Sequence, residues 1–323
     1  MTVSIVIRGY NEEAHIGKLL IGIRQQTLRP LEVILVDSGS TDDTVAIAEG
    51  LGARIVRINK ADFTFGRALN YGCAAAEGDY LVFASAHVFP EGRRWLANLV
   101  APFADPTIAL SYGKQRGGEP NKYSEHRVFC KWFPRVSAVP QASPFCNNAN
   151  CAVRRSIWQT TPYDETLTGL EDLDWAKRVT AEGWRIAYRA DAGVIHVHDE
   201  SWAGVRNRYR REAIAMKRIN PEVHLGLVDV IRLLPEHIAR DSYAAVREGV
   251  FARKLGEIIA FRSNQMFGSW QGFRDRGRLS ADLANRFYYP PRPVDPKGVG
   301  EVDEEVIDYA SLTSTRIRGS KGL

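Results

Sequence analysis

Cysteine, long apolar runs and targeting signals are scarce or missing in this sequence of 323 residues. Its four cysteines, Cys73, Cys130, Cys146 and Cys151, form no C-x-x-C pair, so their spacing indicates neither a zinc site nor a disulfide framework. No stretch of about eighteen apolar residues occurs, which argues against a transmembrane helix. Residues 1–8 lack the charged and apolar regions of a secretion signal. We therefore expect a protein of the reducing cytoplasm.

The composition excludes several classes of protein for the chain as a whole. Hydrophobic residues make up 45% of the chain and charged residues 25%, which excludes disorder, collagen and coiled coil. Lys and Arg outnumber Asp and Glu by 43 to 38, a net charge of +5 that is concentrated between residues 206 and 218. This mild excess serves either solubility or a partner that carries phosphate. Nucleic acid is not the expected partner, because no helix-turn-helix, zinc-finger or RNP pattern is present.

The first hundred residues alternate between strand and helix patterns. Apolar runs at 3–7, 31–36, 54–58 and 80–84 predict strands, and segments with helical spacing of apolar residues separate them. Nearly continuous apolar strands joined by helices predict a parallel sheet that is covered on both faces. In such sheets ligands bind beyond the carboxyl ends of the strands. The residues that follow each strand are therefore the candidates for function.

Five stretches, in this order, carry a resemblance to a known family. They are residues 4–13, 32–44, 66–70, 147–155 and 169–174. Together they resemble the nucleotide-sugar half of the family 2 glycosyltransferases, which adopt the GT-A fold. The resemblance implies an α/β fold with a Rossmann-like, mostly parallel sheet and helices on both faces.

The same resemblance implies a division of the chain. Residues 1–200 would form the GT-A catalytic domain, with a nucleotide-binding half at 1–110 and an acceptor half at 111–200. Apolar residues then recur at helical spacing and predict a helical extension over 201–300. Residues 301–323 are polar, and we expect a loose tail there.

The resemblance also implies a donor site for a nucleoside-diphosphate sugar. We expect it to contain Arg8, Tyr10, Glu12, Asp37, Arg67, Ser85 and Asn148. Tyr10 offers a flat face for the base, Asp37 an acceptor for base or ribose, and Arg67 a positive charge at a helix N-terminus. Each has an ordinary structural alternative: a buried aromatic for Tyr10, a turn or cap residue for Asp37, and a surface ion pair for Arg67.

The sequence departs from the family at the metal motif. Most relatives carry Asp-x-Asp there, which implies a divalent metal, Mn²⁺ or Mg²⁺, but here residues 85–87 are Ser-Ala-His. Ser85 can still hydrogen-bond a ribose, and His87 can bind Mn²⁺ or a softer ion better than Mg²⁺. His196 and His198 point the same way along a predicted strand at 192–197 and can join His87.

Two alternatives to this metal site stay open at the sequence level. The histidines can be ordinary hydrogen-bonded or solvated strand residues. Transfer can also be independent of metal, with Arg67, Arg208 or Arg211 balancing the charge of the leaving group.

Asp172 and Glu171 are the catalytic candidates. By resemblance, Asp172 is the base that deprotonates the acceptor hydroxyl in an inverting transfer, and Glu171 positions the acceptor or the base. The alternative is a helix start, since acidic residues favour the first turn. The two interpretations are compatible, because a base at a helix N-terminus is rigidly held and kept ionised by the helix dipole.

The resemblance thus implies a hexosyltransferase-type enzyme that acts on a glycan or lipid-linked acceptor in surface polysaccharide synthesis. One rival is a non-catalytic scaffold that binds nucleotide sugars. Another is a nucleotidyltransferase, although residues 8–11 are a poor version of its Gly-rich phosphate loop. The C-terminal helices, with basic residues on their polar side, either lie peripherally on the anionic inner face of the membrane or pack on the catalytic domain.

Overall fold

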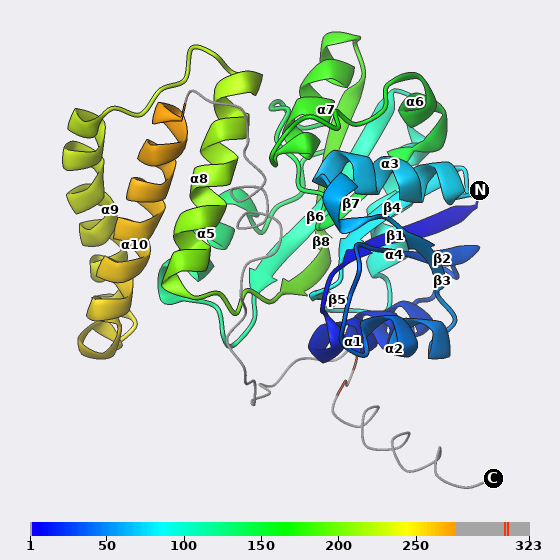
Figure 1. Cartoon of the computed structure of the whole chain (residues 1–323), viewed down its shortest axis with the longest axis horizontal. Coiled ribbons are helices and arrows are strands. Elements are labelled where there is room, and N and C mark those ends of the chain that lie inside the picture. The colour runs from blue at the N-terminus through cyan, green and yellow to red at the C-terminus, as the bar shows by residue number, and fades with distance from the viewer. Residues whose placement is uncertain (1, 276–306, 308, 310–323) are drawn as a thin grey trace, which may run out of the picture.

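The computed structural model describes residues 2–275, 307 and 309 of the chain, and an eight-stranded sheet organises them (Figure 1). Its strand order is β3-β2-β1-β4-β7-β6-β8-β5. The strands are β1 (Val3–Gly9), β2 (Glu32–Asp37), β3 (Arg54–Arg57), β4 (Tyr80–Ser85), β5 (Val88–Pro90), β6 (Ile108–Gly117), β7 (Asn150–Arg154) and β8 (Arg185–His196).

The sheet is mostly parallel. Strands β3, β2, β1 and β4 run parallel to one another, whereas β7 is antiparallel to both β4 and β6. Strand β8 then pairs parallel with β6 and antiparallel with the short β5. The four strands predicted in the first hundred residues are all present. The sequence pattern did not predict β5, β6, β7 or the first half of β8.

Helices cover the sheet on both faces (Figure 1). Those of the first 200 residues are α1 (Glu13–Arg24), α2 (Thr44–Gly50), α3 (Phe65–Ala75), α4 (Trp95–Val100), α5 (Tyr123–Trp132), α6 (Arg155–Thr160) and α7 (Glu171–Ala181), with short 3₁₀ turns at Lys60–Asp62 and Ala101–Ala104. Three longer helices follow, α8 (Trp202–Ile219), α9 (Leu227–Arg247) and α10 (Phe251–Arg274).

Alternating side chains of the central strands divide the core into two layers, as the two-residue period of a strand requires. Ile5 of β1 points to the face that α1 and α4 cover, where Leu19 and Trp95 are fully buried. Val6 points to the opposite face, which α3 and α7 cover, and there Trp175 is fully buried. Burial on both faces explains why these strands are apolar throughout.

The helical extension stands beside the sheet, with α8, α9 and α10 next to one another and α5 close by (Figure 1). A buried ion pair between Arg262 Nε and Asp241 Oδ2, 2.7 Å apart, joins α10 to α9. None of the described helices is both long enough and apolar enough to cross a membrane.

The basic residues of α8 are used inside the protein. Arg206 bonds Gln271, Arg208 pairs with Glu125 and Glu200, Arg210 pairs with Asp275, Lys217 bonds backbone carbonyls near the end of α10, and Arg218 bonds Thr166. The contacts of Arg208 and Arg218 join α8 to the first 200 residues and favour packing there, whereas the other three lie within the helical extension. Contact with a membrane stays a prediction.

The tail predicted at 301–323 lies outside the described residues except at two positions. Ile307 is buried. Tyr309 donates its hydroxyl to the carbonyl oxygen of Pro90, 2.8 Å away, so this point of the chain contacts β5.

Candidate active site

A cavity of about 1690 Å³ opens at the carboxyl ends of β1 and β4. All but two of the predicted site residues line it. They are Arg8, Tyr10, Glu12, Ser85, His87, Asn148, Glu171, Asp172, His196 and His198. Side chains from α5, α8, α9 and α10 close the far side, so the helical extension forms part of the cavity wall.

The structure does not bring Asp37 and Arg67 into this lining. The Asp37 carboxylate is buried and accepts the backbone N–H groups of Gly39 and Ser40, each at 3.1 Å, which closes the turn after β2. Arg67 Nε pairs with Glu165 Oε2 at 2.8 Å. These contacts match the structural alternatives for the two residues, and their roles in donor binding stay predictions.

Asp172 lies in the first turn of α7, facing the cavity. Leu170, just before the helix, has φ of 54°, a left-handed conformation that sets the direction in which the helix starts. Both carboxylate oxygens accept backbone N–H groups: Oδ2 from Asn148 at 3.0 Å and Oδ1 from Leu173 at 2.8 Å. Glu171 Oε1, beside it, pairs with Arg8 Nη1 at 2.7 Å.

Burial decides the protonation of Asp172. Burial first, and then the charge of Glu171, raise the pKa of Asp172 to about 7, although the Asn148 and Leu173 amides and Arg8 act in the opposite direction. From the sequence, we expect the helix dipole to keep Asp172 ionised. The raised pKa means that burial and the charge of Glu171 outweigh any such effect. A carboxylate with a pKa near neutral is a better proton acceptor than an ordinary aspartate.

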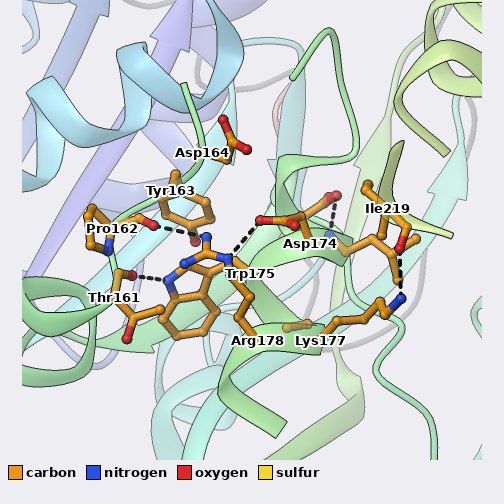
Figure 2. A network of polar contacts seen from close by, with 12 residues as sticks. Thr161, Pro162, Tyr163, Asp164, Asp174, Trp175, Lys177, Arg178 and Ile219 are labelled. Carbon is orange, nitrogen blue, oxygen red and sulfur yellow. Dashed lines mark hydrogen bonds and ion pairs between the residues drawn. The ribbon is translucent and has the colours of Figure 1, made fainter. Parts of the chain in front are cut away.

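Helix α7, whose first turn contains Asp172, is anchored at several later points (Figure 2). The indole N–H of the fully buried Trp175 donates to the carbonyl oxygen of Thr161. Lys177 Nζ donates to the carbonyl oxygen of Ile219 at 2.9 Å, which ties the helix to the end of α8. These contacts hold α7, and with it Asp172, in place.

Three histidines form a cluster in the same cavity. The ring centroids of His196 and His198 are 4.1 Å apart, and the His87 ring lies 5.1 Å from the first and 5.8 Å from the second. One ring nitrogen of each lies within 4.8 Å of one from each of the others. The sequence prediction that these residues act together is thus compatible with their positions, although β8 already ends at His196.

Each Nδ1 of the cluster has a side-chain oxygen partner. The pairs are His87 with Glu12 at 2.9 Å, His196 with Gln115 at 2.7 Å, and His198 with Glu125 at 2.8 Å. The Nε2 atom of His196 is buried and has no hydrogen-bond partner. Oriented imidazoles and an unsatisfied ring nitrogen fit a divalent metal ion, because metal-bound histidines usually donate their other N–H to such an oxygen.

Gln115 and Glu125 contact the histidine cluster, and no local pattern in the sequence indicates either residue. Both lie in the stretch after residue 111, where apolar periodicity is lost. Glu125 also pairs with Arg208. Burial alone would raise the pKa of Glu125, but Arg208 and His198 outweigh it and lower that pKa strongly.

Another part of the cavity lining is aromatic and basic. Lys60 Nζ lies 2.9 Å from the Tyr10 hydroxyl and 4.7 Å from the centre of its ring. The guanidinium groups of Arg8 and Arg211 lie 5.0 and 4.7 Å from the centre of the Phe65 ring. Aromatic faces beside cations suit a base and a diphosphate.

Fold and cavity together define a glycosyltransferase of the GT-A type. Residues 4–161, just under half of the chain, match the model of the family described as Glycosyl transferase family 2. The O-antigen chain rhamnosyltransferase RfbN of Salmonella typhimurium is 28% identical over 211 residues, 62% of this chain and 67% of the relative. WbaN of Salmonella anatum, which has the same description, is 27% identical over 61% of this chain and 66% of its own. The match spans about two thirds of these relatives.

Solved structures share the fold. A mannosyltransferase from Pyrobaculum calidifontis, in complex with GDP-Man and Mn²⁺, superimposes with a TM-score of 0.57 at 18% identity, over 85% of this chain and 88% of that one. Glucosyl-3-phosphoglycerate synthase from Mycobacterium tuberculosis, with Mn²⁺, UDP and glucosyl-3-phosphoglycerate, gives 0.51 at 22% identity, over 70% and 82%. The predicted fold class is confirmed.

Proposed function

We propose that the protein transfers a sugar, with inversion, from a nucleoside-diphosphate sugar to a hydroxyl group of a glycan or lipid-linked acceptor in surface polysaccharide synthesis. The observation that carries this proposal is Asp172, a buried carboxylate of raised pKa that shares one cavity with the histidine cluster and Tyr10. The similarity to two O-antigen chain rhamnosyltransferases supports the acceptor class.

The donor would lie along the strand ends. Tyr10, with Lys60 against its ring, would stack on the base, and Ser85, at the end of β4, would hydrogen-bond the ribose. The diphosphate would then reach the histidine cluster, because His87 follows Ser85 by two residues. Arg211, which also lines the cavity, would add positive charge.

His87, His196 and His198 are the residues that would hold a divalent metal. Such an ion, when bound, balances the negative charge of the departing diphosphate. Glu12 acts through His87, whose ring it orients, rather than on the nucleotide directly.

Asp172 would take the proton of the acceptor hydroxyl. Glu171, tied to Arg8, would hold its place beside the base and raise the proton affinity of Asp172 by its charge. Inversion follows when the base and the leaving diphosphate lie on opposite sides of the sugar carbon. We infer a cytoplasmic location from the nucleotide-sugar donor and from four cysteines that are free thiols, three of them buried.

The experiment is a donor screen followed by turnover. UDP, GDP, dTDP and CMP sugars are tested by thermal shift, each with Mn²⁺, with Mg²⁺ and with chelator, since a ligand of the native state raises its melting temperature. Sugars that bind are then incubated with candidate acceptors, and the anomeric configuration of the product is read by NMR. We expect an inverted product. Tight donor binding without turnover, under every metal condition, would instead indicate the scaffold.

A further inference from the structure

We propose that His87, His196 and His198 form a preorganised three-nitrogen site that binds one Zn²⁺-class transition-metal ion before any donor arrives and discriminates against Mn²⁺ and Mg²⁺. This inference deepens the proposed function and rests on it for the role of the ion. The site itself is argued from the donor atoms, their orientation and their spacing.

The donor atoms decide which metal class fits. All three ligands are imidazoles, which suit Zn²⁺, Co²⁺, Ni²⁺ and Cu²⁺, whereas Mg²⁺ and Mn²⁺ favour oxygen. The nearest carboxylates are engaged elsewhere: Glu12 orients His87 and Glu125 orients His198. An oxygen-rich grouping of Glu125, His198 and Glu200 lies beside the cluster, but Arg208 already pairs with both of its carboxylates.

The orientation of the rings leaves the right nitrogen for the metal. An oxygen partner at each Nδ1 favours the tautomer that carries its proton there, so the Nε2 lone pair is available. His196 shows this most clearly, because its Nε2 is buried and has no hydrogen-bond partner.

The spacing fits a tetrahedral ion. With metal–nitrogen bonds of about 2.0–2.1 Å, imidazoles on one tetrahedral ion have ring centres about 5 Å apart. The three measured separations, 4.1, 5.1 and 5.8 Å, lie on either side of that value. Three protein ligands would leave a fourth position open, and all three histidines line the cavity from which a diphosphate oxygen would approach the ion.

The test measures metal binding directly on the full chain without an affinity tag. Protein stripped with chelator is titrated with Co²⁺, and the visible absorption of the tetrahedral ion is recorded in the absence of nucleotide. Zn²⁺, Mn²⁺ and Mg²⁺ then compete for the site. We expect one ion per chain, Zn²⁺ binding at least about 100-fold tighter than Mn²⁺, and no competition from Mg²⁺.

Variants assign the site to the cluster. We expect His87→Ala and His198→Ala each to weaken Co²⁺ binding by about 100-fold or more, and Glu12→Ala by about 10-fold. His237→Ala is the matched control, because His237 lines the same cavity outside the cluster. Its Co²⁺ affinity should equal that of the parent. Circular dichroism of each variant verifies that it folds.

Three results would overturn the inference: Co²⁺ that binds only with nucleotide present, Mn²⁺ that competes as well as Zn²⁺, or unchanged affinity in folded His87→Ala and His198→Ala. Failure of this inference differs from failure of the proposed function. Metal-stripped protein that takes up no ion yet transfers sugar at the full rate would refute the metal site alone. If the protein binds Zn²⁺ as expected but turns over no donor sugar, the metal site is supported and the proposed transferase activity is refuted.

Discussion

Arg8 and Glu171 are 163 residues apart in the sequence, yet their side chains form an ion pair with 2.7 Å between Nη1 and Oε1. The pair ties the end of β1 to the first turn of α7 and is largely buried, with side-chain exposures of 15% and 6%. It stands beside Asp172, whose pKa Glu171 raises and Arg8 lowers. The pair therefore adjusts the proton affinity of the proposed base.

Removing the charge of Glu171 and removing the charge of Arg8 should shift the acid limb of the pH–rate profile in opposite directions. Glu171→Gln removes the negative charge, so the pKa of Asp172 should fall and activity should persist to lower pH. Arg8→Met removes the positive charge and should move the limb to higher pH. The measurement is kcat/KM for sugar transfer against pH, and shifts of the same sign would contradict the proposed coupling.

In the parent enzyme, activity should decline as pH falls through about 7, because only ionised Asp172 accepts a proton. At pH 8, where Asp172 of the parent is mostly ionised, Asp172→Asn should lower kcat by about 10²- to 10⁴-fold, and the difference should shrink as the pH falls. Asp174→Asn is the matched control, since Asp174 lies in the same helical turn but bonds Arg178 instead (Figure 2). Equal losses in the two variants would show that Asp172 acts only on the helix.

The raised pKa of Asp172 also has a cost in stability. Relative to a variant without the charge, the parent should lose stability as pH rises from the unfolded pKa of 3.8 through the folded value of about 7. Between pH 5 and pH 8, Asp172→Asn should gain about 2 to 3 kcal/mol on the parent. Denaturant unfolding of both proteins at the two pH values measures this. A constant difference would mean that Asp172 titrates normally.

Tyr10 should contribute to donor binding through its ring more than through its hydroxyl. Tyr10→Ala should weaken binding of the matching nucleoside diphosphate by about 0.5 to 1.5 kcal/mol, the typical contribution of an aromatic pair. Tyr10→Phe keeps the ring and should cost less, although it loses the contact with Lys60. Calorimetric titration of both variants decides this, and equal affinities in parent and Tyr10→Ala would exclude stacking.

The ion pair between Arg262 and Asp241 should be essential for the helical extension. Its side chains are only 7% and 3% exposed, so Arg262→Met leaves a buried carboxylate without its partner. We expect a loss of about 3 to 5 kcal/mol in unfolding free energy. Adding Asp241→Leu to that variant should recover much of it. A double variant as unstable as the single one would mean that packing, not charge, governs this site.

How far the sequence predicts the fold depends on what each strand contacts. Strands β1, β2 and β4 are buried by helices on both faces, and the edge strand β3 packs Ile55 and Val56 against the two core layers, so their apolar runs are readable in isolation. Strand β6 carries Ser111, Lys114 and Gln115, and it is stable because Gln115 bonds His196 and because β7 and β8 flank it. Such partners come from distant segments, and no local pattern reports them.

The same distinction, between local patterns and contacts with distant segments, decides which site residues the sequence predicts. Residues at strand ends, such as Tyr10 and His87, were predictable because parallel strands end at a common edge. Glu12 lines the cavity as expected, but nothing in the sequence indicates its contact with His87. Arg67 carries a charge that suits a diphosphate, and only the structure shows that its guanidinium forms an ion pair with Glu165. The sequence reports the chemistry of a residue, whereas its partner depends on the folded chain.

The most direct measurement of the proposed activity is the release of nucleoside diphosphate from the donor sugar found in the screen. The rate is measured for the parent and for Asp172→Asn, side by side, with a hydroxyl acceptor present. We expect steady release by the parent, and a rate at least about 100-fold lower for a folded Asp172→Asn that still binds the donor. Equal rates for the two proteins, or no release by a parent that binds the donor tightly, would contradict the assignment of Asp172 as the base of a glycosyltransferase.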